Sequence, residues 1–86
     1  MEGIRIGEVT HFFTNINVAV IQLTDSINIG DLVHFLGRTS DFRQEVRSLQ
    51  IEHQSISTAA AGQEVAMRVN RRVRRGDKVF RLVKEE

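Results

Sequence analysis

The chain has 86 residues, no cysteine and a formal net charge of +1, so we expect one domain over residues 1–86 with a small core and no deep cleft. The lack of cysteine excludes disulfides and thiolate metal sites. The longest wholly apolar run, Val18–Ile21, is far shorter than the roughly 20 residues of a membrane helix. The first residues do not have the pattern of a signal peptide, and we therefore predict a cytoplasmic location.

The first half of the chain favours β-strands separated by short polar turns. Residues 4–13 are rich in β-formers, although neither alternating face is purely apolar. Residues 14–17 carry the asparagines of a turn, and residues 18–24 form a near-continuous apolar strand. Asp25 and Ser26 predict the next turn, a glycine turn at Gly30 precedes a strand over residues 32–37, and residues 37–40 form another polar break.

Residues 42–54 alternate between apolar and polar residues, but the alternation changes parity. Phe42 and Val46 share one parity, whereas Leu49 and Ile51 share the other. A strand buries both pairs on one face only if an extra residue is inserted, which predicts a β-bulge near residues 47–48. The competing interpretation is an amphipathic helix, because positions 42, 46 and 49 also have helical spacing.

The second half begins with residues 55–61, which predict one helical turn that ends at Gly62. Residues 64–69 then alternate cleanly, and the last strand runs through Val83. A pattern of an apolar residue, a glycine and a valine recurs in Ile27-Asn-Ile-Gly-Asp-Leu-Val33, Ala59-Ala-Ala-Gly-Gln-Glu-Val65 and Val73-Arg-Arg-Gly-Asp-Lys-Val79. Repeated strand entries of this kind predict an all-β fold, a small closed barrel of six or seven strands with its core over about residues 4–83.

These three segments resemble the strand entries of the second domain of translational GTPases of the elongation factor Tu type. The run Thr39-Ser-Asp-Phe-Arg-Gln-Glu-Val-Arg-Ser-Leu-Gln-Ile-Glu-His53 is similar to the barrel at the C-terminus of some collagenase-like peptidases and to short stand-alone elongation-factor-like proteins. The resemblance implies a translation-factor-type barrel with turn glycines at Gly30, Gly37, Gly62 and Gly76. The chain has no phosphate-binding loop motif, so GTP binding is not expected.

Positive charge is concentrated near the end of the chain. The stretch Arg68–Lys84 holds eight of the twelve Lys and Arg residues and one acid, which gives it a formal charge of +7, whereas the other residues sum to −6. Such asymmetry favours a phosphate-bearing partner, and we predict a non-catalytic RNA-binding module for tRNA or rRNA. The predicted phosphate contacts are Arg68, Arg71, Arg72, Arg74, Arg75, Lys78, Arg81 and Lys84.

Two other interpretations of this charge stay open. The basic stretch is neutralised by the chain's own acids, such as Glu45, Glu52 and Glu64, or it docks onto a protein. In the second case the chain is a protein-interaction barrel, an accessory subunit of a collagenase-like peptidase or of an RNA-modifying protein, in which opposite charges set the docking register.

Catalysis, cofactors and metals are not expected. His11, His34 and His53 lack the spacing of metal ligands, and the carboxylate pairs Asp25/Asp31 and Asp41/Glu45 suit turns and strand entries better than acid–base work. We also expect all five phenylalanines in the core. The alternative leaves Phe12, Phe13 or Phe42 on the surface for docking.

Overall fold

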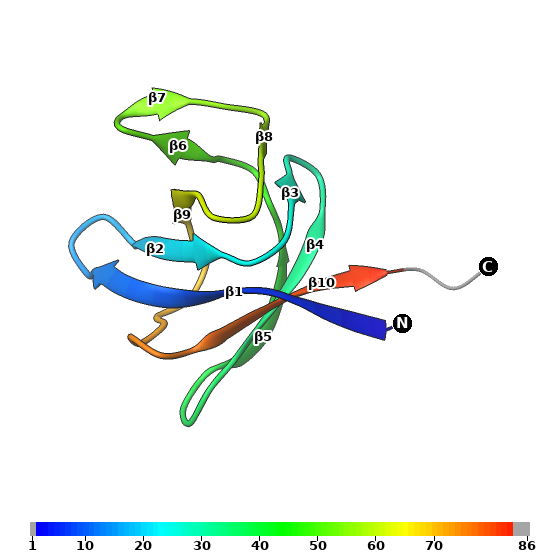
Figure 1. Ribbon diagram of the computed structural model, residues 1–86. Coiled ribbons are helices and arrows are strands. Elements are labelled where there is room, and N and C mark those ends of the chain that lie inside the picture. The colour runs from blue at the N-terminus through cyan, green and yellow to red at the C-terminus, as the bar shows by residue number, and fades with distance from the viewer. Residues whose placement is uncertain (1, 84–86) are drawn as a thin grey trace.

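The computed structural model describes residues 2–83, in which ten β-strands are joined by turns and no helix occurs (Figure 1). This part of the chain therefore contains no helix with the length and apolarity to cross a membrane. The strands are β1 (Glu2–Phe13), β2 (Val18–Leu23), β3 (Ile27–Asn28), β4 (Leu32–Leu36), β5 (Asp41–Glu45), β6 (Gln50–Ile51), β7 (Gln54–Ser55), β8 (Thr58–Ala59), β9 (Glu64–Arg68) and β10 (Lys78–Val83).

Eight strands form one sheet in the order β5-β4-β10-β1-β2-β9-β6-β7, while β3 and β8 pair separately. Every pair is antiparallel. The all-β prediction is therefore confirmed at the level of an antiparallel, helix-free fold in residues 2–83.

The long strand β1 is bent by two register shifts, between Arg5 and Gly7 and between Val9 and His11. Its first part pairs with β10 and its second part with β2. Each shift adds a residue, and for this reason the inward positions Ile6, Val9 and Phe12 are three residues apart instead of two. The bulges explain why neither parity of residues 4–13 is purely apolar.

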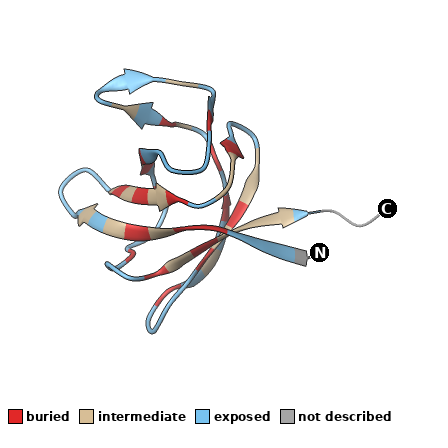
Figure 2. Ribbon diagram, in the orientation of Figure 1, coloured by how far each residue is buried: buried red, intermediate tan, exposed pale blue. Residues whose placement is uncertain are grey.

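The core is built from strand positions that alternate as the sequence predicts (Figure 2). On β2 the inward residues are Ala19, Ile21 and Leu23, and on β9 they are Val65 and Met67. The buried hydrophobic residues are Ile6, Val9, Ala19, Ile21, Leu23, Ile27, Val33, Phe35, Val46, Leu49, Ala59, Val65, Met67, Val69, Val73 and Val79.

The strand pairing in residues 41–55 is interrupted where the β-bulge was predicted, but the cause is different. Strand β5 ends at Glu45, residues 46–49 have no regular structure, and β6 begins at Gln50. The break is therefore a crossing and not a bulge inside one strand: β5 pairs with β4, whereas β6 pairs with β9 and β7. Val46 and Leu49 are both buried because the chain passes over the core between these pairings. The competing helix is wrong.

The helical turn predicted for residues 55–61 is also wrong. This segment contains the end of β7 and the two-residue strand β8. Ala59 is buried and pairs with Ile27 of β3. A pairing between residues so far apart in the sequence overrides the local preference of alanine for helix.

Side chains join β5 to the end of β9. Gln44 is only 6% exposed, donates from Nε2 to the carbonyl oxygen of Arg68 at 3.0 Å and accepts from the backbone N–H of Asn70 at 2.7 Å. Ser48 Oγ accepts from the backbone N–H of Arg68 at 3.2 Å. We call this set of contacts the side-chain seam, because the two side chains take the place of backbone ladder bonds.

Candidate functional site

The predicted arginine cluster lies on the loop of residues 69–77 between β9 and β10, here called the basic loop. Val69, Val73 and Asp77 are buried and recur every four residues, while Arg71, Arg72, Arg74 and Arg75 between them are exposed. The apolar anchors thus fix the loop to the core and turn the arginines outward.

Backbone hydrogen bonds hold the basic loop in place. Val69 N–H donates to the carbonyl oxygen of Asn17 at 2.9 Å, and Gly76 N–H donates to that of Val9 at 2.8 Å. The Asp77 carboxylate, 4% exposed, accepts from Ser40 Oγ at 2.5 Å and from Arg74 N–H at 2.9 Å. The arginines are therefore presented by an ordered backbone.

Arg71, Arg72, Arg74 and Arg75 form no ion pair with any carboxylate in the described part of the chain. Three of them, Arg72, Arg74 and Arg75, line an open depression of about 530 Å³ together with Thr10, His11, Phe12, Thr14 and Val73. The loop therefore offers a concentrated positive surface beside the end of β1.

The other predicted cations do not share this surface. Arg68 ends β9 and is exposed on the outer side of the sheet. Lys78 Nζ lies 3.1 Å from Glu8 Oε1. Arg81, with its side chain 21% exposed, donates to the carbonyl oxygen of Ser26 and lies 3.8 Å from Asp25. Lys84 lies outside the described residues.

The chain's own acids neutralise part of the basic stretch, but through other residues than the sequence suggested. Glu45, Glu52 and Glu64 form no ion pair within residues 2–83, whereas Glu8 and Asp25 do. The hydrogen bond and charge of Lys78, and to a smaller extent the charge of Arg5, hold the pKa of the Glu8 carboxyl below its ordinary value.

An exposed apolar tip lies beside the basic loop. Phe13 is 46% exposed and Ile16 is 55% exposed, both at the β1–β2 turn, and Ile16 borders the same depression as Arg68 and Val69. In Figure 1 this hairpin lies at the end of the molecule away from the N-terminus. The expectation that all five phenylalanines lie in the core is wrong for Phe13 and Phe80, because consecutive strand residues point to opposite faces and Phe12 and Val79 take the inward positions beside them.

The four turn glycines serve two different needs. Gly30, Gly62 and Gly76 have φ of 95°, 91° and 94°, which L side chains rarely adopt. Gly37 instead makes a close approach: a Cβ atom there would overlap Asp77 Oδ1. Gly37 and the buried carboxylate thus belong to one packing unit beneath the basic loop.

The histidines are spread over the fold. His34 pairs with Asp41 at 2.6 Å, and His11 lies against Phe13 with ring centroids 4.4 Å apart. In residues 2–83 no three metal-ligating side chains come together.

The chain is similar to parts of larger proteins. No protein-family model matches it. It is 39% identical over 83 residues to an uncharacterized protease of Methanocaldococcus jannaschii. The matched stretch covers 95% of this chain and 20% of the relative. It is 29% identical over 87 residues to a collagenase of Porphyromonas gingivalis. This second matched stretch covers 99% of this chain and 21% of the relative. The chain thus spans about a fifth of the length of the curated relatives it matches.

Solved structures establish the fold. The C-terminal domain of a candidate U32 peptidase from Geobacillus thermoleovorans superimposes with a TM-score of 0.87 and 21% identity over 92% of both chains. Its selenomethionine variant gives 0.85 over 90% of this chain and 98% of that one. The likeness to collagenase-like peptidases predicted from residues 39–53 is confirmed.

The predicted function as an RNA-binding module of the translation-factor type is wrong. Proteins that match almost the whole chain include a protease and a collagenase, and the fold is similar to that of a domain of a candidate peptidase. Charge asymmetry indicates an anionic partner, but it does not distinguish phosphate from carboxylate. The eight predicted cations also do not form one free surface, because Lys78 and Arg81 already contact groups of the chain itself.

Proposed function

We propose that the chain is a non-catalytic protein-interaction unit, a domain or subunit that works with a collagenase-like peptidase. One observation carries this proposal: the similarity spans 95% of the chain but only 20% of the M. jannaschii protease. In this proposal the other four fifths of such a protein carry out the chemistry, and the present fold supplies contacts. A cytoplasmic location stays a prediction.

The docking surface in this proposal combines the basic loop with the apolar tip. Arg71, Arg72, Arg74 and Arg75 are exposed without an ion pair in residues 2–83. Ile16 borders a depression with Val69 and Asn70 at the start of the basic loop, and Phe13 lies in the same turn as Ile16. An aromatic residue with adjacent arginines is the composition of many interface centres. The partner surface that fits is an apolar patch with aspartates and glutamates at its rim, and the charges would steer its approach.

We also infer that the sheet closes into a barrel of the elongation factor Tu type. Strands β5 and β6 are consecutive in the chain, yet they stand near opposite ends of the sheet order. The crossing at residues 46–49 and the side-chain seam from Gln44 and Ser48 to β9 support this closure. A closed sheet leaves fewer free strand edges, so that docking depends on side chains.

Affinity capture tests the proposed function. The chain is immobilised and exposed to the M. jannaschii protease without its matching stretch. Capture is expected with the natural chain and is expected to be clearly weaker with Arg72, Arg74 and Arg75 all changed to alanine. Changing Arg38, Arg43 and Arg47 to alanine removes the same charge elsewhere, and this control is expected to keep capture. Equal capture by both triple variants would contradict the proposed surface, and no capture at all would contradict the function.

A further inference from the structure

A groove runs along the outer side of β9, on the face of the sheet away from the core. Cross-strand pairs place Phe13 opposite Val18, Val20 opposite Ala66, and Ala66 opposite Gln50. Residues directly opposite one another in an antiparallel pair point to the same face. An outer face in contact with water is normally polar, whereas Val18, Val20 and Ala66 make this one apolar and half-buried.

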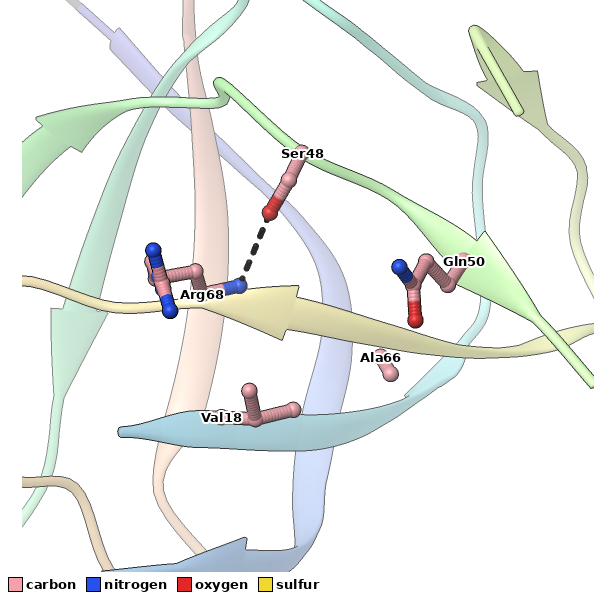
Figure 3. A pocket seen from close by; sticks show the side chains of 5 residues that line it. All are labelled: Val18, Ser48, Gln50, Ala66 and Arg68. Carbon is pink, nitrogen blue, oxygen red and sulfur yellow. Dashed lines mark hydrogen bonds between the residues drawn. The ribbon is translucent and has the colours of Figure 1, made fainter. Parts of the chain in front are cut away.

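Two adjoining depressions form the groove. The first, of about 310 Å³, is lined by Val18, Ser48, Gln50, Ala66 and Arg68. Figure 3 shows it on both sides of β9, with Gln50 above the strand and Val18 below it. The second, of about 210 Å³, shares Gln50 and Ala66 and continues to Phe13, Val20, Glu52, His53, Glu64 and Val65.

The two ends of the groove carry opposite charge. Arg68 stands at one end of β9 and Glu64 at the other, and both are exposed. Glu52 adds a second carboxylate at the Glu64 end. Four residues of strand span about 13 Å at the usual rise of about 3.3 Å per residue, so the two charges match positions i and i+4 of another extended chain.

The wall of the groove is a strained hairpin. The two-residue turn between β6 and β7 consists of Glu52 and His53, with φ of 50° and 66°. Such turns are normally built from Asn and Gly, because bulky residues rarely adopt positive φ. Two unfavourable residues at a turn that borders the groove suggest a role in contact.

We propose that this groove binds an extended peptide segment of the partner protein. The segment places an acidic side chain against Arg68, an apolar side chain over Val20 and Ala66, and a basic side chain against Glu64 and Glu52. These three side chains stand at positions i+4, i+2 and i of the segment, which share one face of an extended chain. The inference rests on the proposed function and gives the partner a second, sequence-selective contact besides the basic loop.

The test uses three labelled, end-blocked peptides and fluorescence anisotropy with the chain alone. They are Lys-Ser-Leu-Ser-Glu, Lys-Ser-Leu-Ser-Lys and Glu-Ser-Leu-Ser-Glu. The first satisfies both ends of the groove when its Lys lies against Glu64 and its Glu against Arg68, and it is expected to bind roughly fivefold more tightly than either like-charged peptide. Arg68→Glu should transfer the preference to the Lys/Lys peptide, and the double change of Glu52 and Glu64 to Lys should transfer it to the Glu/Glu peptide. Arg43→Glu, on another strand, should leave the order unchanged.

Several results would overturn the proposal that the groove binds a peptide. One such result is no binding at millimolar peptide, and another is equal binding of the three peptides. A third is an NMR amide spectrum in which the peptide shifts the signals of the basic loop and leaves those of Val18, Gln50 and Ala66 unchanged. Self-association of the chain that the first peptide does not reverse would assign the groove to a second copy and would also overturn the proposal. No peptidase is present in this assay, so its failure is independent of the affinity capture, which tests the proposed function itself.

Discussion

Replacement of Gln44 by leucine tests how the sheet is held together at the side-chain seam. Leucine keeps much of the side-chain volume and removes both hydrogen bonds, from Nε2 to the carbonyl of Arg68 and from the N–H of Asn70 to Oε1. Both backbone groups are only partly buried, so water reaches them, and each lost partner costs about 1 kcal/mol, the low end of the range for an unsatisfied polar group. We expect the free energy of unfolding to fall by about 2 kcal/mol.

Circular dichroism is the suitable probe, because the chain has no tryptophan or tyrosine for fluorescence. A loss of about 2 kcal/mol in a domain of this size lowers Tm by about 8–16 °C. The matched control is Gln54→Leu at an exposed position of β7, which should change the stability by less than about 0.5 kcal/mol. A Gln44→Leu protein as stable as this control would refute the argument that the seam replaces backbone pairing.

Three further predictions concern the packing and charge around the basic loop. Gly37→Ala places a Cβ atom against the Asp77 carboxylate and should cost about 1–3 kcal/mol in urea unfolding; a melting temperature unchanged from that of the natural chain would contradict this. Asp77→Ala leaves a buried hydroxyl and a backbone N–H of the loop unpaired and should cost about 2–4 kcal/mol, with faster amide exchange in residues 74–77; unaltered exchange would speak against it. Because the pKa of Glu8 is lowered by Lys78, this pair stabilises the fold above the ordinary pKa of glutamate, and the contribution is lost as the pH falls through the lowered value. Glu8→Gln should therefore reduce the loss of stability on acidification, and identical pH profiles of the two proteins would refute the assignment.

The parts of the fold that follow local rules could be predicted from the sequence. Val65 and Met67 alternate with outward-facing residues because one face of β9 is buried, and Val69 continues the pattern just after the strand. The same holds for Ala19, Ile21 and Leu23 on β2. Strand β1 defied this rule because its bulges shift the parity twice. Bulge positions depend on the pairing partners, which a single strand does not reveal.

Contacts between distant residues account for the errors. Ala59 lies in a strand because Ile27 pairs with it, although local preference favours a helical turn. The arginines of the basic loop are evident in the sequence, but the pairing of Lys78 with Glu8, 70 residues away, and of Arg81 with Ser26, 55 residues away, depends on the fold. Charge counting therefore overestimated the available cations and could not distinguish an acidic protein partner from RNA.

The sequence contained a signal for the exposed apolar tip, although a count of phenylalanines does not reveal it. Phe12 and Phe13 are adjacent, and a strand that faces the core on one side buries only one of two adjacent residues. Phe12 packs against the core and Phe13 is exposed. Because the bulge fixes which of the two points inward, the identity of the exposed residue required the structure.

The most direct test of the central claim is isothermal titration calorimetry of the chain with the M. jannaschii protease without its matching stretch. We predict one-to-one binding that weakens about tenfold when Arg72, Arg74 and Arg75 are changed to alanine, the sum of three modest charge contacts. The triple alanine variant at Arg38, Arg43 and Arg47 should bind as the natural chain does. Absence of heat at high protein concentration, or equal affinities of the two triple variants, would contradict the account of this fold as a docking unit that uses its basic loop.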